Sequence, residues 1–135
     1  MKVLIVDDDS SIRSMLRWII ENKGNEVVGE AGNGQEAIEA SERLRPDLVL
    51  LDISMPVMGG FPAARYLHEH FPGLPFIFVS QHREQVYLEE ALACGARGFI
   101  VKSAAATELP TALKVFEEGQ VYQSCLIGNA RFNPR

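Results

Sequence analysis

Cysteine is nearly absent, since Cys94 and Cys125 are the only two in a chain of 135 residues. They lie far apart in the sequence, and neither belongs to a CxxC pair of the kind found in zinc or redox sites. The chain therefore lacks the disulfide framework that stabilises small secreted domains. We expect reduced thiols and a fold held together by its hydrophobic core.

Long hydrophobic runs are also missing. Apolar runs such as Val3–Val6 and Leu48–Leu51 are far shorter than the ~20 residues that cross a bilayer. The first residues, Met1-Lys2 and then a strand-like run ending in three aspartates, do not have the order of a signal peptide. We expect no membrane-spanning segment and a cytoplasmic location.

The chain has few positive charges. Its 13 Lys and Arg are outnumbered by 18 Asp and Glu, which gives a formal net charge of -5. Direct binding to nucleic acid needs clustered Lys and Arg to contact phosphates. Any contact with DNA is therefore expected to come from a domain outside this chain.

The residues that are present predict one α/β domain. Hydrophobic residues make up 47% of the chain, enough for a core in a domain of this length. Five short apolar runs alternate with segments of helical periodicity, a pattern typical of a parallel sheet. The strands are expected at Lys2 to Asp7, Glu26 to Ala31, Asp47 to Asp52, Pro75 to Ser80 and Arg97 to Lys102. Strands that are apolar almost throughout indicate helices on both faces, and thus a doubly wound three-layer sandwich.

Residues with capping and breaking properties predict where the five helices begin and end. Asp9 or Ser10 is expected to cap the first helix, and Asn33 followed by Glu36 resembles a capping box for the second. The other expected limits are Gly24, Pro46, Pro72-Gly73, Gly95, Thr107 as the N-cap of the fifth helix, and Gly119. Residues 1–119 then form the domain, and residues 120–135 are expected to be a linker or tail.

Acidic residues stand at the ends of two predicted strands. For strand order 2-1-3-4-5, ligands bind beyond the carboxyl ends of strands one and three, where the winding direction reverses. Asp7, Asp8 and Asp52 are expected to meet there. Like charges a few Å apart repel by about 4 kcal/mol at an effective dielectric of 20, so the cluster must bind protons or a cation. Hard oxygen ligands of this kind suit Mg²⁺ or Mn²⁺.

A hydroxyl and an ammonium group are expected on the same rim, because Ser80 and Lys102 end the fourth and fifth strands. A cation and Lys102 would balance the negative oxygens of a phosphoryl group, and Ser80 would donate a hydrogen bond to it. A carboxylate would act as the nucleophile.

Four separated motifs now carry a family resemblance. VLIVDDDSSIR, LVLLDISMPVMGG, IFVSQHR and GARGFIVKSA resemble, in this order, the receiver domain of two-component response regulators, over about residues 2 to 119. The resemblance implies a flavodoxin-like fold. The segment from EEALACGARGFIVKSA to the end of the fifth helix looks most like receivers that precede a LuxR/NarL-type helix-turn-helix domain.

The resemblance also implies a role for each matching residue. Asp52 matches the phosphoacceptor, and Lys102 matches the lysine that pairs with the phosphoryl group. Asp7 and Asp8 match the acidic pair that holds the metal together with Asp52 and the backbone carbonyl of Ser54. Ser80 and Phe99 match the two switch residues. His82 and Ser54 are expected to tune the lifetime of the phosphoryl group. Ser103 departs from the family, which commonly has proline after the lysine, and Gly59-Gly60 predicts flexibility after Pro56.

The implied function is signalling. A sensor histidine kinase transfers a phosphoryl group to Asp52, and phosphorylation packs Phe99 inward and changes the face formed by the fourth helix, fifth strand and fifth helix. A homodimer formed on phosphorylation and control of a DNA-binding output domain outside this chain would follow. The chain is not expected to be an enzyme, apart from phosphoryl transfer to its own Asp52 and slow self-dephosphorylation.

Two other functions stay open at this point. The chain could be a single-domain or phosphorylation-independent receiver that acts by protein contact. Asp7-x-Asp9-x-Ser11 also fits the start of haloacid-dehalogenase-like phosphatases, in which Asp7 would be the nucleophile.

Overall fold

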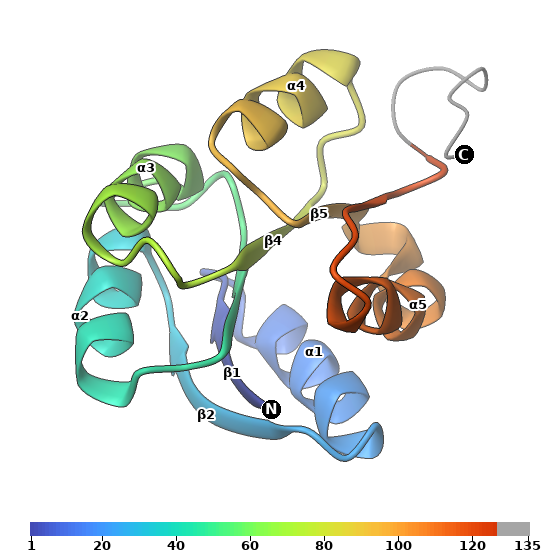
Figure 1. Ribbon diagram of the computed structural model, residues 1–135, viewed down its shortest axis with the longest axis horizontal. Coiled ribbons are helices and arrows are strands. Elements are labelled where there is room, and N and C mark those ends of the chain that lie inside the picture. Colours follow the sequence, from blue (N-terminus) through green and yellow to red (C-terminus); the bar gives the residue numbers. More distant parts are fainter. Residues whose placement is uncertain (127–135) are drawn as a thin grey trace.

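The computed structural model describes residues 1–126, and Figure 1 shows a central sheet with helices on both sides. The six strands are all parallel and lie in the order β2-β1-β3-β4-β5-β6. They are β1 (Lys2–Val6), β2 (Glu26–Ala31), β3 (Leu48–Leu51), β4 (Phe76–Ser80), β5 (Gly98–Val101) and β6 (Tyr122–Gln123). The helices are α1 (Ser10–Asn22), α2 (Gly34–Leu44), α3 (Gly60–His70), α4 (Gln85–Ala93), the 3-10 turn η1 (Lys102–Ala104) and α5 (Ala105–Glu117). The predicted flavodoxin-like sandwich with strand order 2-1-3-4-5 is confirmed.

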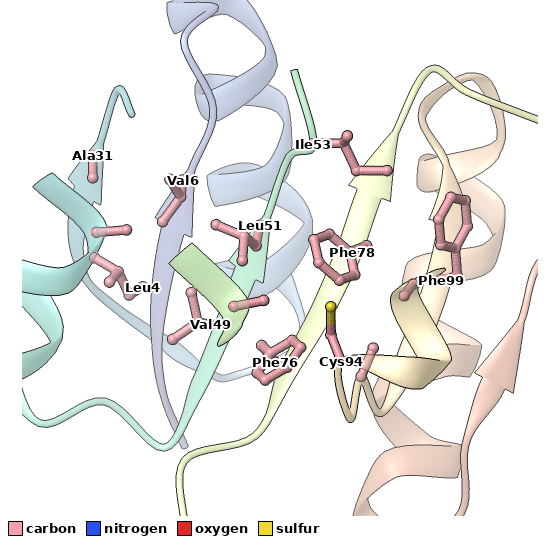
Figure 2. Close-up of a cluster of buried hydrophobic side chains, with 14 of the residues drawn as sticks. Leu4, Val6, Ala31, Val49, Leu51, Ile53, Phe76, Phe78, Cys94 and Phe99 are labelled. Carbon is pink, nitrogen blue, oxygen red and sulfur yellow. The ribbon is translucent and has the colours of Figure 1, made fainter. Parts of the chain in front are cut away.

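The core has two halves, one on each face of the sheet, because successive strand residues point to opposite faces. Leu4 and Val6 belong to the half covered by α2, α3 and α4, part of which Figure 2 shows. Val3 and Ile5 belong to the half covered by α1 and α5. Residues Leu48 to Leu51 are all fully buried, which explains why β3 is apolar throughout.

Most predicted helix limits are confirmed. The side chain of Asp9 caps α1 by accepting the backbone N–H of Ser11 at 2.8 Å. Asn33 caps α2 in the same way through the N–H of Glu36 at 2.9 Å. The glycines expected to end the first, fourth and fifth helices have the positive φ angles of a left-handed C-terminal cap, and these are Gly24, Gly95 and Gly119.

Two expectations for the C-terminal part need correction. Thr107 does not cap the fifth helix, because η1 leads from β5 directly into α5, which begins at Ala105 and leaves Thr107 exposed within its first turn. The segment after Gly119 is not entirely irregular either. Tyr122 and Gln123 pair with Gly98 and Phe99 as strand β6, so this part of the expected linker belongs to the sheet. Residues 127–135 of the same predicted linker lie outside the described part of the chain.

No helix within residues 1–126 combines the length and the apolar character that crossing a bilayer requires.

Candidate functional site

Three carboxylates meet at the carboxyl edge of the sheet, as the strand order predicts. Asp7 directly follows β1 and Asp52 directly follows β3, and they are only 1% and 3% exposed. Asp8 is exposed beside them. One carboxylate oxygen from each of the three lies within 4.8 Å of the others. Two adjacent strand ends thus concentrate negative charge at one point.

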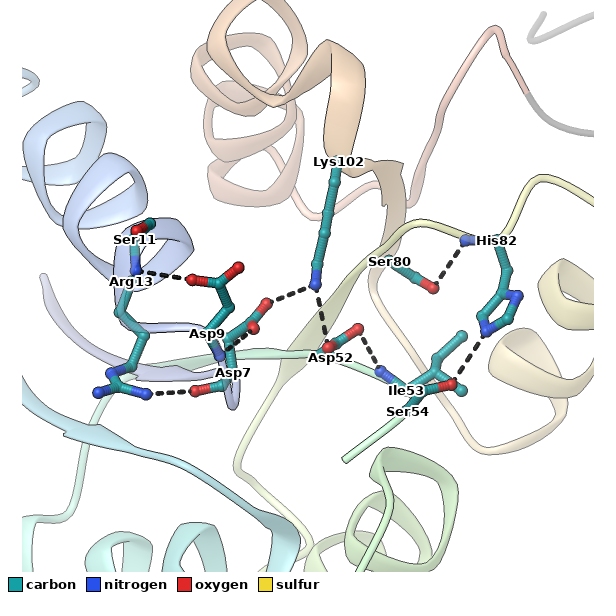
Figure 3. Close-up of polar contacts among 10 residues, drawn as sticks. All are labelled: Asp7, Asp9, Ser11, Arg13, Asp52, Ile53, Ser54, Ser80, His82 and Lys102. Atoms are coloured by element: carbon teal, nitrogen blue, oxygen red, sulfur yellow. Dashed lines mark hydrogen bonds and ion pairs between the residues drawn. The ribbon is translucent and has the colours of Figure 1, made fainter. Parts of the chain in front are cut away.

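Lys102 lies between the two buried carboxylates (Figure 3). Its Nζ is 2.8 Å from Asp7 Oδ2 and 3.0 Å from Asp52 Oδ2. Burial alone would lower the pKa of Lys102, but its interactions with the carboxylates of Asp7 and Asp52 outweigh it and raise this pKa. Burial and the charge of Asp7 raise the pKa of Asp52, and Lys102 offsets them only in part. One cation therefore does not compensate the acidic cluster fully.

The donor set fits a hard cation. Lys102 is close to Asp7 Oδ2 but is not aligned for a hydrogen bond, and this buried oxygen has no hydrogen-bond partner within residues 1–126. Buried polar atoms are normally paired, so an unpaired carboxylate oxygen beside two other carboxylates suits an ion such as Mg²⁺. Asp9 is not part of the cluster, because it caps α1. That role removes one of the two aspartates that a phosphatase motif would need.

His82 connects the loops after β3 and β4. Its Nε2 lies 3.0 Å from Ser54 Oγ, and its backbone N–H donates to Ser80 Oγ at 3.1 Å. The imidazole stacks on Tyr87, with ring centroids 4.0 Å apart and planes 12° apart. The structure therefore brings together three of the predicted site residues, Ser54, Ser80 and His82. Sequence reasoning singled them out separately and did not predict that they touch.

Phe99 lies away from the rim, within β5. Its side chain is fully buried, and its ring centroid is 6.4 Å from that of Phe78. The expectation was that phosphorylation packs Phe99 inward, but the ring is already inside in this structure. Ser103, which stands where the family commonly has proline, lies in η1, and the peptide bond between Lys102 and Ser103 is trans.

Two contacts with the site were not predicted by the sequence analysis. Arg13 Nη1 donates to the backbone carbonyl of Asp7 at 2.6 Å, which no periodicity in α1 indicates. Gly60 is buried and lies so close to the backbone of Asp52 that a Cβ atom would overlap its carbonyl group. The Gly59-Gly60 pair was the available signal, but Gly60 serves close packing there and not flexibility.

Comparison with known proteins agrees with this geometry. The family model of the response regulator receiver domain matches residues 3–114. The chain is 45% identical over 101 residues to the chemotaxis protein CheY of Thermotoga maritima, covering 75% of this chain and 84% of that protein. It is 34% identical over 125 residues to the response regulator GacA of Pseudomonas syringae, covering 92% of this chain but only 58% of GacA.

Solved structures extend the likeness to three dimensions. The isolated receiver domain of RcsB from Salmonella enterica, in the presence of the phosphomimetic BeF3-, has a TM-score of 0.84 and 28% identity, with 91% of this chain and 92% of that one covered. A structure of RcsB dimers bound to DNA also has a TM-score of 0.84 and 28% identity, with 91% of this chain and 63% of that one covered. The chain belongs to the response regulator receiver domain family.

Proposed function

We propose that this chain accepts a phosphoryl group on Asp52 from a sensor histidine kinase, in the presence of Mg²⁺ or Mn²⁺. The observation that carries the proposal is the buried Asp52 carboxylate, which has Lys102 at 3.0 Å and the carboxylates of Asp7 and Asp8 within 4.8 Å. A site that only stabilised the fold would not bury two carboxylates with a single cation.

The chemistry follows from the groups present. A carboxylate oxygen of Asp52 attacks phosphorus, the P–N bond to the kinase histidine breaks, and the imidazole leaves with the electron pair of that bond. Lys102 balances the charge of the phosphoryl oxygens. Asp8, Asp52 and the backbone carbonyl of Ser54 would hold the metal, with Asp7 acting beside them. When bound, the ion neutralises charge that builds up on the phosphoryl oxygens.

Ser80 is the residue best placed to report phosphorylation. Its oxygen accepts the N–H of His82 at 3.1 Å, which leaves its own proton free to donate to a phosphoryl oxygen. Because Phe99 is already buried, the change would begin with Ser80 and the loop after β4. It would then reach the α4-β5-α5 face as a population shift.

His82 and Ser54 are the residues we assign to tuning the phosphoryl lifetime. We propose that their contact at 3.0 Å, which joins the β3–α3 and β4–α4 loops, limits the access of water to this side of the site. In His82→Ala the dephosphorylation rate is expected to rise several-fold, because water gains access to the site. The rate is measured by loss of the phosphorylated mass with time, and an unchanged rate would remove His82 from this role.

The output is proposed to lie outside this chain. The chain spans 58% of GacA and 63% of the RcsB chain in the DNA complex, and the residues of RcsB beyond the matched part are where a DNA-binding domain would lie. We propose control of transcription through such a domain, with a homodimer formed on phosphorylation. The alternative is a single-domain or phosphorylation-independent receiver that acts by protein contact.

Intact-protein mass after incubation with a small acyl phosphate and Mg²⁺ tests the proposal. One added phosphoryl group is expected in the wild type and none in Asp52→Asn. Labelling that persists in Asp52→Asn but is lost in Asp7→Asn would support the phosphatase mechanism. Absence of any adduct at saturating Mg²⁺ would favour the phosphorylation-independent receiver.

A further inference from the structure

We propose that Arg13 is a positioning residue for the acidic loop after β1 and that Glu30 anchors it for this role. The inference rests on the phosphoacceptor function proposed above. Arg13 belongs to α1, and Figure 3 shows its side chain reaching back to the backbone of Asp7. It does not belong to the carboxylate cluster itself.

The guanidinium group of Arg13 connects the ends of two strands. Its Nη1 donates to the carbonyl oxygen of Asp7 at 2.6 Å, directly after β1. Its Nε donates to Glu30 Oε1 at 2.9 Å, near the end of β2. The planar guanidinium fixes these donors relative to each other, so the position of Glu30 determines where the carbonyl of Asp7 is held.

Glu30 is itself held firmly. Its second oxygen, Oε2, accepts a hydrogen bond from Arg17 Nε at 2.8 Å. Burial alone would raise the pKa of Glu30, but hydrogen bonds from Arg17 and Arg13 lower it below its ordinary value. Glu30 therefore stays ionised at neutral pH. Each of its oxygens has an arginine partner, but only Arg13 extends from Glu30 to the acidic loop.

The position of the Asp7 carbonyl influences where Asp8 lies. This carbonyl belongs to the planar peptide group that joins Asp7 to Asp8, so holding the oxygen sets the direction in which the chain leaves toward Asp8. The Asp8 side chain is exposed, and no hydrogen bond from another residue within 1–126 holds it. Its place in the cluster therefore depends on the backbone that carries it. The side chain of Asp7 is fixed separately, by the N–H of Asp9 at 2.9 Å.

Charge and positioning predict opposite effects when Arg13 is removed. Loss of a positive charge near three carboxylates would by itself strengthen the binding of a cation. Loss of the hydrogen bond to the Asp7 carbonyl would loosen Asp8 and weaken binding. Substitution of residues that orient metal ligands typically lowers metal affinity tenfold or more, so positioning is expected to prevail.

The experiment is a titration of the whole chain with Mn²⁺, in which electron paramagnetic resonance measures the free ion. Arg13→Gln is expected to raise the Kd for Mn²⁺ about tenfold, and Arg13→Lys is expected to raise it less, because lysine keeps the charge and one donor. Arg17→Gln is the matched control: it removes the same charge from the same helix and one of the two arginine partners of Glu30, but it leaves the hydrogen bonds of Arg13 to Glu30 and to the Asp7 carbonyl in place. Its Kd is expected to stay within about twofold of the wild type. Circular dichroism checks that each variant is folded.

Three outcomes would overturn the inference. Binding that is unchanged or tighter in Arg13→Gln would show that charge outweighs positioning. Equal weakening in Arg17→Gln would assign the effect to the helix surface in general. A wild type that binds no Mn²⁺ and takes up no phosphoryl group would overturn the proposed function together with this inference. If the wild type binds Mn²⁺ and takes up a phosphoryl group, the proposed function stands, and a negative result with the variants overturns only the role of Arg13.

Discussion

Replacing Asp52 by Asn is expected to raise the free energy of unfolding of the metal-free protein at neutral pH, although it breaks an ion pair. Oxygens of Asp7 and Asp52 lie within 4.8 Å, a distance at which two charges repel by about 3.5 kcal/mol at an effective dielectric of 20. On the same scale the attraction between Lys102 and Asp52 at 3.0 Å is about 5.5 kcal/mol and exceeds this repulsion, but Lys102 keeps Asp7 as a partner at 2.8 Å after the substitution. Burial of the Asp52 charge, the main cause of its raised pKa, adds a cost that Asn does not have and that decides the sign of the change. We expect a net gain of about 1 to 2 kcal/mol.

The gain should depend on pH with a definite sign. Burial, followed by the charge of Asp7, raises the pKa of Asp52 above its ordinary value of 3.8. The folded state therefore binds a proton at Asp52 more tightly than the unfolded state does. The penalty in the wild type is full above the raised pKa and declines as the pH falls through it toward 3.8. The advantage of Asp52→Asn should shrink over the same interval.

Urea unfolding of both proteins from pH 8 to pH 4, without divalent ions, measures the difference. Glu69→Gln, which removes an exposed carboxylate from α3, controls for the general effect of net charge. Added Mg²⁺ should stabilise the wild type more than Asp52→Asn, because only the wild type keeps all three carboxylates. A less stable Asp52→Asn at pH 7, or a difference that grows on acidification, would refute the reasoning.

Three further predictions concern neighbouring parts of the fold. Lys102→Met should lower the free energy of unfolding by about 3 kcal/mol, because it leaves two buried carboxylates without their cation. The double variant Lys102→Met/Asp52→Asn should recover most of this loss, and no recovery would contradict the ion-pair geometry. Gly60→Ala should lower the free energy of unfolding, measured in urea, by about 2 kcal/mol or more, because its Cβ atom would overlap the Asp52 carbonyl. Gly73→Ala is the control: a Cβ atom at Gly73 would lie in open space, so this change should be close to neutral. Burial and the charge of Glu108 raise the pKa of Tyr122 to about 12. Alkaline titration of phenolate absorbance should show that this pKa falls in Glu108→Gln but stays above 10, because the burial remains, and no change would exclude the influence of the Glu108 charge.

The fold could be predicted from the sequence wherever a repeating pattern was long enough to read. Strands such as β3, buried on both faces, appear as continuous apolar runs, and the caps at Asp9 and Asn33 depend on local chemistry. Thr107 failed as a predicted cap because η1 had already started the helix, which depends on how β5 ends. The two-residue strand β6 has no period to detect. It forms because the edge of β5 offers unpaired backbone groups at Gly98 and Phe99.

The site could be predicted to the extent that strand topology determines it. Asp7, Asp52 and Lys102 meet because parallel strands end at one edge, and that follows from the order of the strands alone. Contacts between side chains in different loops do not follow from it. The pair of His82 and Ser54 was found only in the structure, since it depends on the path of two loops whose conformations no local rule determines.

The electrostatic imbalance at the site links stability to function. Two buried carboxylates and one exposed carboxylate share a single ammonium group, although a fold optimised only for stability would bury none of them. A neutral Asn at position 52 would suit the metal-free protein better, and yet it could not accept the phosphoryl group that we propose Asp52 receives. The carboxylates of the cluster thus repel one another in the metal-free protein. A bound cation removes this repulsion, because the ion interacts most strongly with the charges that repel one another most. The same repulsion that lowers the stability of the metal-free fold should therefore raise its affinity for the metal, and the two quantities should change in opposite directions in any variant that alters the charge of Asp7 or Asp52 alone.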